Sequence, residues 1–277
     1  MIAPFANLFG YILNFIYNIV NNYGLAIIIF SILIKIILLP LSIKQQKTMK
    51  KTTKIQNKLK EIQFKYKNDP ENLNRATMEL YKTENMSPFS GCFSGIVQII
   101  LLFAVFYLVR SPLTYMKKID PGIIENYRNE ISAENDGKIS NYYEIEIIQK
   151  KAAQDENIKV NMDFLGLDLS KVPSQNMTDI KVYIIPILYV ISSIFSIKMT
   201  TGKTNKKEQN GSSQPDMTQQ MNKSMSYMMP IMAVSIAFVA PLGLALYWLI
   251  SNILMILERI VINKYVDSKE EKTLCLK

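Results

Sequence analysis

Long apolar runs alternate with charged stretches along the chain. Four runs stand out: Leu25–Ile43, Phe93–Val109, Tyr183–Ile197 and Met225–Leu257. A helix needs about 20 residues to cross a bilayer core. The last run is too long for one span, and Pro-Leu-Gly interrupts it at 241–243, so we divide it into two. The pattern predicts an all-α polytopic membrane protein with five transmembrane helices.

The charges between the runs predict an orientation. Residues 44–84 hold 11 Lys and Arg against 5 acids, residues 112–179 hold 8 against 12, and residues 198–226 hold 5 against 2. Cytoplasmic loops are enriched in Lys and Arg. The N-terminus is therefore predicted outside and the C-terminus in the cytoplasm.

Residues 1–22 lack the basic start of a signal peptide. Their polar and apolar positions each recur at helical spacing: Asn7, Tyr11, Asn14, Asn18 and Asn21 on one face, and Phe5, Leu8, Ile12, Phe15 and Ile19 on the other. This predicts an amphipathic helix on the outer membrane surface. A sixth span is the alternative.

The basic stretch after the first span predicts two antiparallel helices. Asp69 can cap a new helix, and Pro70 suits the first turn of that helix. Such a hairpin is either a solvated structure or a docking surface for a ribosome, a targeting factor or a nascent chain. The candidate docking residues are Tyr66, Lys67, Asp69, Pro70, Leu73 and Leu80.

Two other stretches give weaker signals. The predicted outer segment, 111–181, is acidic, and only a helix near Ser140–Asn157 is predicted within it. Residues 200–223 have the composition of a flexible cytoplasmic linker.

Lys35 is the only charge in the first apolar run. A lysine near the centre of a span costs about 2.5–3.5 kcal/mol on insertion scales. The usual counter-ion is an acid on another span, but the other apolar runs contain no Asp or Glu. Lys35 is therefore neutral, hydrated in a wet cavity, or matched by a charge from another chain.

Uncharged polar residues also occur inside the predicted spans. They are Ser31, Gln98, Ser192, Ser193, Ser196 and Asn252, with Tyr247 and Trp248 one turn before Asn252. Each alone is typical of polar contacts between helices. Together with Lys35 they indicate a polar cavity within the bundle.

The composition argues against several classes of site. The chain has no His and only two cysteines, Cys92 and Cys275, whose spacing fits neither a disulfide framework nor a metal site. The net charge of +9 lies in loops between apolar runs, which favours membrane topology over sequence-specific nucleic-acid binding. We expect no cofactor, no metal and no enzymatic activity.

Three stretches resemble the YidC/Oxa/Alb membrane protein insertases. They are LLPLSIKQQKTMKK at Leu38–Lys51, NMSPFSGCFSGIVQ at Asn85–Gln98, and MMPIMAVSIAFVAPLGLALYWLISN at Met228–Asn252. The resemblance covers nearly the whole chain except the outer segment. It is closest to the compact, Gram-positive bacterial type.

The resemblance implies five spans around a hydrophilic groove that opens to the cytoplasm and to lipid. Lys35 would be the groove charge, with Gln98 and Trp248 lining it, and residues 66–80 would lie near the hairpin tip. The sequence departs from the family where Lys35 replaces an arginine, where Ser94 and Ile99 replace frequent prolines, and where the third span ends in SSIFS, which weakens a lining role for Ser196. The outer segment is also longer than the compact type leads us to expect.

The implied function is insertion and folding of membrane proteins in the bacterial plasma membrane, alone or with the Sec translocon. Lys35 would attract acidic residues of a substrate tail. The partners would be nascent membrane proteins, the bilayer, and ribosomes or signal-recognition factors. The alternatives are a small anion transporter or channel subunit, and a structural assembly factor.

The predicted organisation gives the following ranges: surface helix 1–22, first span 23–43, cytoplasmic hairpin 44–86, second span 89–110, outer segment 111–181, third span 182–199, cytoplasmic linker 200–223, fourth span 224–240, fifth span 242–262 and cytoplasmic tail 263–277.

Overall fold

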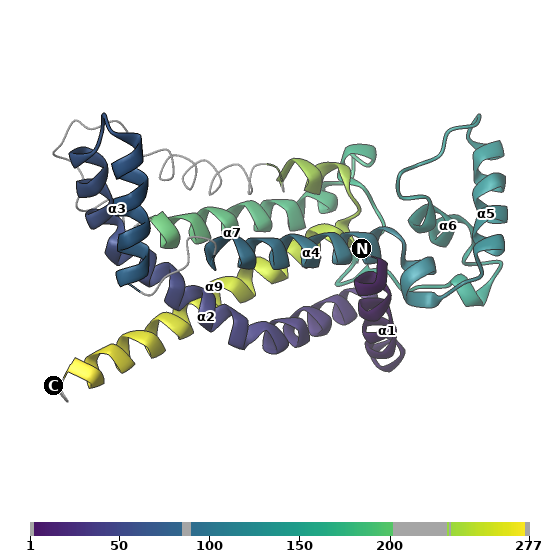
Figure 1. Ribbon diagram of the computed structural model, residues 1–277. Coiled ribbons are helices and arrows are strands. Elements are labelled where there is room, and N and C mark those ends of the chain that lie inside the picture. The colour runs from purple at the N-terminus through teal and green to yellow at the C-terminus, as the bar shows by residue number, and fades with distance from the viewer. Residues whose placement is uncertain (1–2, 85–89, 202–231, 233, 275–277) are drawn as a thin grey trace. The chain divides into compact units, whose positions relative to one another are not determined.

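The computed structural model describes residues 3–84, 90–201, 232 and 234–274 (Figure 1). The chain divides into two compact units. The first unit comprises Met1–Lys35 and Leu101–Ile256, and the second comprises Ile36–Ile100 and Leu257–Lys277.

Helices make up nearly all of the described chain. The long helices are α1 (Ala3–Val20), α2 (Tyr23–Lys65), α4 (Ser90–Arg110), α7 (Ile184–Thr201) and α9 (Leu242–Leu274). The shorter ones are α3 (Pro70–Thr83), η1 (Leu113–Lys117), α5 (Pro121–Glu134), α6 (Tyr143–Lys151), η2 (Glu156–Ile158), η3 (Pro173–Gln175) and η4 (Ile180–Tyr183). The strands β1 (Asp163–Phe164) and β2 (Leu167–Asp168) form one antiparallel pair.

Four helical stretches are long and apolar enough to cross a membrane. They are Ala3–Val20, Tyr23–Thr48, Ile180–Met199 and Leu242–Ile262, with a shorter apolar stretch at Ile100–Arg110. The prediction of an all-α polytopic membrane protein is confirmed. Most of the predicted fourth span and of the 200–223 linker lies outside the described residues.

The first turns of α2 and α9 are bonded to the 111–181 segment. Tyr23 N donates to the Asn161 carbonyl at 2.9 Å, while Leu242 N and Gly243 N donate to the carbonyls of Lys171 and Leu169, each at 2.9 Å. The first N–H groups of any helix lack partners within the helix. The 111–181 segment supplies these partners and thereby fixes where both helices begin.

A buried carboxylate fixes the turn that follows α4. Glu144 accepts hydrogen bonds from Thr114 N at 2.9 Å and from Thr114 Oγ1 at 2.6 Å. Burial raises the pKa of Glu144, although the hydrogen bonds from Thr114 act in the opposite direction. Arg110, at the end of α4, donates from Nε to the Asn141 carbonyl at 2.8 Å. The end of α4 is thus held by the same segment as the starts of α2 and α9.

Two helices of the 111–181 segment are joined by ion pairs. The buried Lys151 on α6 lies 2.9 Å from Glu130 and 3.0 Å from Glu134 on α5. The hydrogen bond from Lys151 to Glu130 raises the pKa of Lys151 most, and the hydrogen bond to Glu134 raises it further. The helix predicted at Ser140–Asn157 is confirmed as the shorter α6, because a turn follows Lys151 and Asp155 caps η2. Helix α5 was not predicted.

Helix α1 packs against η1 at a glycine. Phe9, Leu13 and Ile16 are buried on the packed face. A Cβ atom at Gly10 would lie only 1.8 Å from the Tyr115 carbonyl oxygen. The close approach of the two backbones therefore requires glycine at position 10.

The second unit contains the predicted helical hairpin. The end of α2 and α3 run side by side (Figure 1). A Lys58–Glu84 ion pair of 2.6 Å joins them, and Ile55 and Leu80 are buried. As predicted, Asp69 caps α3, accepting from Asn72 N at 3.1 Å, and Pro70 occupies the first turn. Hydrogen bonds from Asn72 lower the pKa of Asp69.

We predict that Gly10→Ala separates α1 from η1, because the new methyl group would overlap the Tyr115 carbonyl. Amides 113–117 should then exchange hydrogen faster in the reconstituted protein. Gly243→Ala is the matched control, since its Cβ would lie 3.4 Å from the nearest atom, in the Tyr23 ring. Equal protection in both variants would contradict the packing described above.

Candidate functional site

Lys35 lies at the end of the first unit on α2, and its side chain is half-buried. Ser31, one turn before it, is buried, and its hydroxyl donates to the Ile27 carbonyl at 2.7 Å. That bond stays within α2. The Ser31 hydroxyl is thus bonded within its own helix, one turn before Lys35.

Three of the predicted polar residues come together between α7 and α9. Asn252 Nδ2 donates to Ser192 Oγ at 2.9 Å and to Ser193 Oγ at 3.1 Å. Ser192 Oγ in turn donates to the Tyr189 carbonyl at 2.9 Å. We call Ser192, Ser193 and Asn252 the polar seam. An amide nitrogen carries two hydrogens, so the seam uses both donors of Asn252.

Aromatic residues lie one turn before Asn252 along α9. The Trp248 ring packs on Tyr189 of α7 with centroids 6.2 Å apart. Trp248 and Tyr247 are both buried, and no group in the described part of the chain accepts the Trp248 indole N–H. Ser196, one turn after the seam serines, is also buried. The Trp248–Tyr189 contact thus packs α9 against α7 one turn before the seam.

An apolar groove runs along the outside of this helix pair. It has a volume of about 380 Å³ and is lined by Leu188, Ile191, Phe195, Leu249, Ile253, Ile256 and Ser192. Ser192, part of the seam, contributes the one polar side chain of this lining. Our sequence reasoning missed the groove. Leu188, Ile191 and Phe195 recur at helical spacing, but this spacing is typical of any lipid-facing side of a helix.

Part of the predicted site is not tested by the described residues. Gln98 lies in α4, but its side chain is outside the described part. A hydrophilic groove with a central positive charge stays a prediction. No group of three or more His, Cys, Asp or Glu that could hold a metal occurs among the described residues.

The hairpin candidates differ in exposure. Lys67 and Pro70 are exposed, Tyr66, Asp69 and Leu73 are half-buried, and Leu80 is buried inside the hairpin. Phe64, which was not predicted as a site residue, is 80% exposed next to the turn. Lys65 Nζ lies 5.2 Å from the centroid of the Tyr66 ring. The hairpin turn thus combines an exposed aromatic ring with several cations.

The family model described as "60Kd inner membrane protein" matches residues 15–270. The chain belongs to this family. The match confirms the resemblance to the YidC/Oxa/Alb insertases and includes Lys35, the polar seam and the hairpin.

Curated relatives agree along most of the chain. A protein of Fusobacterium nucleatum is 31% identical over 255 residues, which are 92% of this chain and 93% of the relative. One of Caldanaerobacter subterraneus is 28% identical over 98% of each chain. One of Treponema denticola is 28% identical over 95% of this chain, which spans only 38% of that relative. All three carry the name "Membrane protein insertase YidC".

We predict that the polar seam stabilises the contact between α7 and α9 by about 0.6 kcal/mol, the average for hydrogen bonds between membrane helices, and by no more than about 1.7 kcal/mol, the largest value found. A double-mutant cycle combining Asn252→Ala with Ser192→Ala and Ser193→Ala should show this coupling in unfolding measurements in mixed detergent. Ser31→Ala is the control, because the Ser31 hydroxyl bonds within its own helix. Strictly additive effects of the seam substitutions would contradict the prediction.

Proposed function

We propose that the protein inserts and folds integral membrane proteins, without cofactor or enzymatic chemistry. One observation carries the proposal: the chain matches the family model over residues 15–270 and aligns with nearly the full length of a relative named a membrane protein insertase. Polar and charged groups within its membrane helices agree with this activity.

Lys35 is proposed to receive the hydrophilic tail of a substrate. A half-buried cation on an apolar helix is costly in lipid. An acidic residue of an incoming tail would be attracted to the Lys35 side chain. A groove that admits water would at the same time reduce the cost of moving the tail part-way into the bilayer. Lysine supplies the charge but lacks the two-pronged geometry of arginine.

The apolar groove along α7 and α9 is proposed to guide the hydrophobic helix of the substrate. Its aliphatic and aromatic lining resembles lipid chains. Ser192 is already bonded to Asn252 and to the Tyr189 carbonyl, so its hydroxyl has little to offer a passing helix. An apolar helix can therefore pass along the groove and leave sideways into the bilayer.

The proposed orientation places the N-terminus and the 111–181 segment outside and the C-terminus in the cytoplasm. In support, this segment holds the starts of α2 and α9 and the end of α4, as one side of an alternating bundle requires. Lys118 Nζ lies 4.5 Å from the centroid of the Tyr11 ring, and Lys117 Nζ lies 5.9 Å from that of Tyr17. A cation beside the middle of α1 and a second one beside its last turn favour a surface helix over a sixth span.

The hairpin of α2 and α3 is proposed as the docking surface for ribosomes or signal-recognition factors. Its basic residues suit an acidic partner, and Phe64 offers an exposed aromatic side chain. Action with the Sec translocon is compatible with the same arrangement. Nascent membrane proteins and the bilayer are the remaining partners.

We predict that Lys35→Leu lowers insertion of a single-span substrate with an acidic outer tail by about tenfold, since a charged hydrogen bond contributes about 1.5–3 kcal/mol. Lys35→Arg should retain most of the activity. The measurement is protease protection of the substrate in proteoliposomes containing only this protein.

A substrate with a neutral tail is the matched control and should respond little to Lys35→Leu. Equal insertion of the acidic substrate by wild type and Lys35→Leu would remove Lys35 from the mechanism. Solute flux without insertion by wild type would instead indicate a transporter.

We predict that Phe64→Ser weakens cosedimentation of the proteoliposomes with translating ribosomes by about tenfold, because burial of a phenylalanine stabilises a complex by about 1.5–3 kcal/mol. Met78→Ser is the control, because Met78 is also an exposed apolar residue of the hairpin but lies along α3, away from the turn. Unchanged binding by Phe64→Ser with an intact hairpin would remove Phe64 from the docking surface.

A further inference from the structure

Two large apolar side chains of the 111–181 segment are almost fully exposed. Leu165 is 86% exposed at the tip of the β1–β2 hairpin, and Ile180 is 81% exposed at the first residue of η4. Exposed apolar residues indicate a protein or membrane contact when they belong to a contiguous apolar surface, and not when they are scattered singly. Each of them adjoins the start of a membrane-spanning stretch.

Ile180 heads the exposed apolar stripe of α7. Helix η4 leads directly into α7, and Ile184, Ile187, Ile191 and Ile194 continue along the same side at spacings of three and four residues. The apolar membrane-spanning stretch itself begins at Ile180. The stripe that faces lipid along α7 therefore extends up to Ile180 without a break.

Leu165 adjoins the start of α2. Asn22 Nδ2 donates to the Asp163 carbonyl at 2.6 Å, and the Phe164 ring occupies the space where a Cβ of Gly24 would lie. These contacts attach the hairpin to the first turn of α2. The exposed side chains of Leu25 and Ile29 begin just beyond it.

The turn itself gives a second reason to assign a role to Leu165. Leu165 and Gly166 have φ values of 54° and 77°, as the central residues of a type I′ turn require. Asparagine or glycine suits the first of these positions, and a branched apolar residue does not. The backbone thus gives no reason for leucine at position 165, whereas an apolar surrounding for its side chain does.

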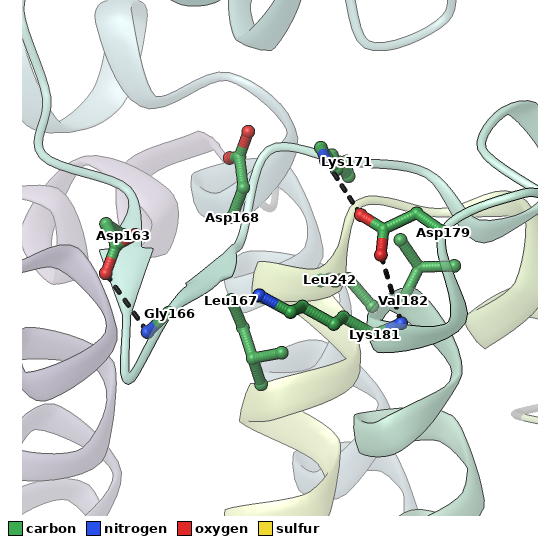
Figure 2. A pocket seen from close by; sticks show the side chains of 9 residues that line it. All are labelled: Asp163, Gly166, Leu167, Asp168, Lys171, Asp179, Lys181, Val182 and Leu242. Atoms are coloured by element: carbon green, nitrogen blue, oxygen red, sulfur yellow. Dashed lines mark hydrogen bonds and ion pairs between the residues drawn. The ribbon is translucent and has the colours of Figure 1, made fainter.

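The hairpin and η4 lie side by side around a small cavity (Figure 2). The cavity has a volume of about 170 Å³, and its lining includes Leu167 of the hairpin, Val182 of η4 and Leu242, the first residue of α9. The starts of α2, α7 and α9 therefore meet at this part of the 111–181 segment. Lys181 also lines the cavity.

We propose that Leu165 and Ile180 form an interfacial pair that inserts into the outer leaflet of the bilayer and anchors the 111–181 segment to the lipid surface. The partner is the phospholipid bilayer rather than a protein, because both residues continue the lipid-facing sides of membrane helices. The proposal is independent of the insertase activity, since it concerns only the contact with lipid.

The test places a spin label at each position of the full chain in liposomes. Leu165→Cys and Ile180→Cys are made in a chain whose Cys92 and Cys275 are replaced by serine. Accessibility to oxygen, which enters lipid, is compared with accessibility to a water-soluble nickel chelate. Ile187→Cys on α7 is the lipid control, and Asn129→Cys on the exposed side of α5 is the aqueous control.

The interfacial pair should show an oxygen-to-nickel ratio close to that of Ile187 and several-fold above that of Asn129. A ratio at either position that matches the ratio at Asn129 would place the side chain in water and overturn the proposal. In that case the natural partner of the two residues would be another protein and not lipid. A second variant separates anchoring from folding. Leu165→Asn suits the turn, so faster hydrogen exchange of amides 163–168 in liposomes, with unchanged exchange in detergent, supports the loss of a lipid contact.

Discussion

The hydrogen bonds between the 111–181 segment and the ends of the membrane helices are the constraint on which the rest of the first unit depends. Apolar helices in lipid gain no hydrophobic energy by meeting each other, so burial alone does not set where one helix begins beside another. Here the carbonyls of Asn161, Leu169 and Lys171 fix the first turns of α2 and α9. The segment therefore sets the relative heights of the helices that carry Lys35 and Asn252.

The polar groups within the apolar helices make two kinds of hydrogen bond. Asn252 donates to Ser192 and Ser193 between two helices, whereas the Ser31 hydroxyl bonds within α2. Bonds of the first kind stabilise helix packing. Lys35 is a half-buried lysine in the apolar stretch of α2, and ionisable residues in such stretches commonly mark functional sites.

Local signals were enough to predict the elements that depend on neighbouring residues. The Asp69–Pro70 pair predicted the start of α3, and the break at Pro241 precedes α9. The Asp120–Pro121 pair is the same signal at the start of α5, and it would have predicted that helix. Long-range features could not be predicted in this way. Glu144 is one of many acids in its segment, and only the tertiary fold buries it against Thr114.

The candidate site was likewise predicted only in part. The sequence indicated that the seam residues were polar positions inside spans, but the pairing of Asn252 with two serines 59 and 60 residues away depends on how α7 and α9 pack. The groove beside them was missed because its lining residues look like any lipid-facing set. The interfacial pair was missed because no strand or turn was predicted around Leu165.

Ser192, the polar side chain of the groove lining, is already hydrogen-bonded, and this has a consequence for selectivity. A wall that offers only dispersion contacts discriminates between passing helices by their overall hydropathy and barely by the order of their residues. Under the proposed function, the groove would then accept many unrelated sequences with similar dwell times. The protein would then accept a broad range of substrates because the Ser192 hydroxyl is already bonded within the protein.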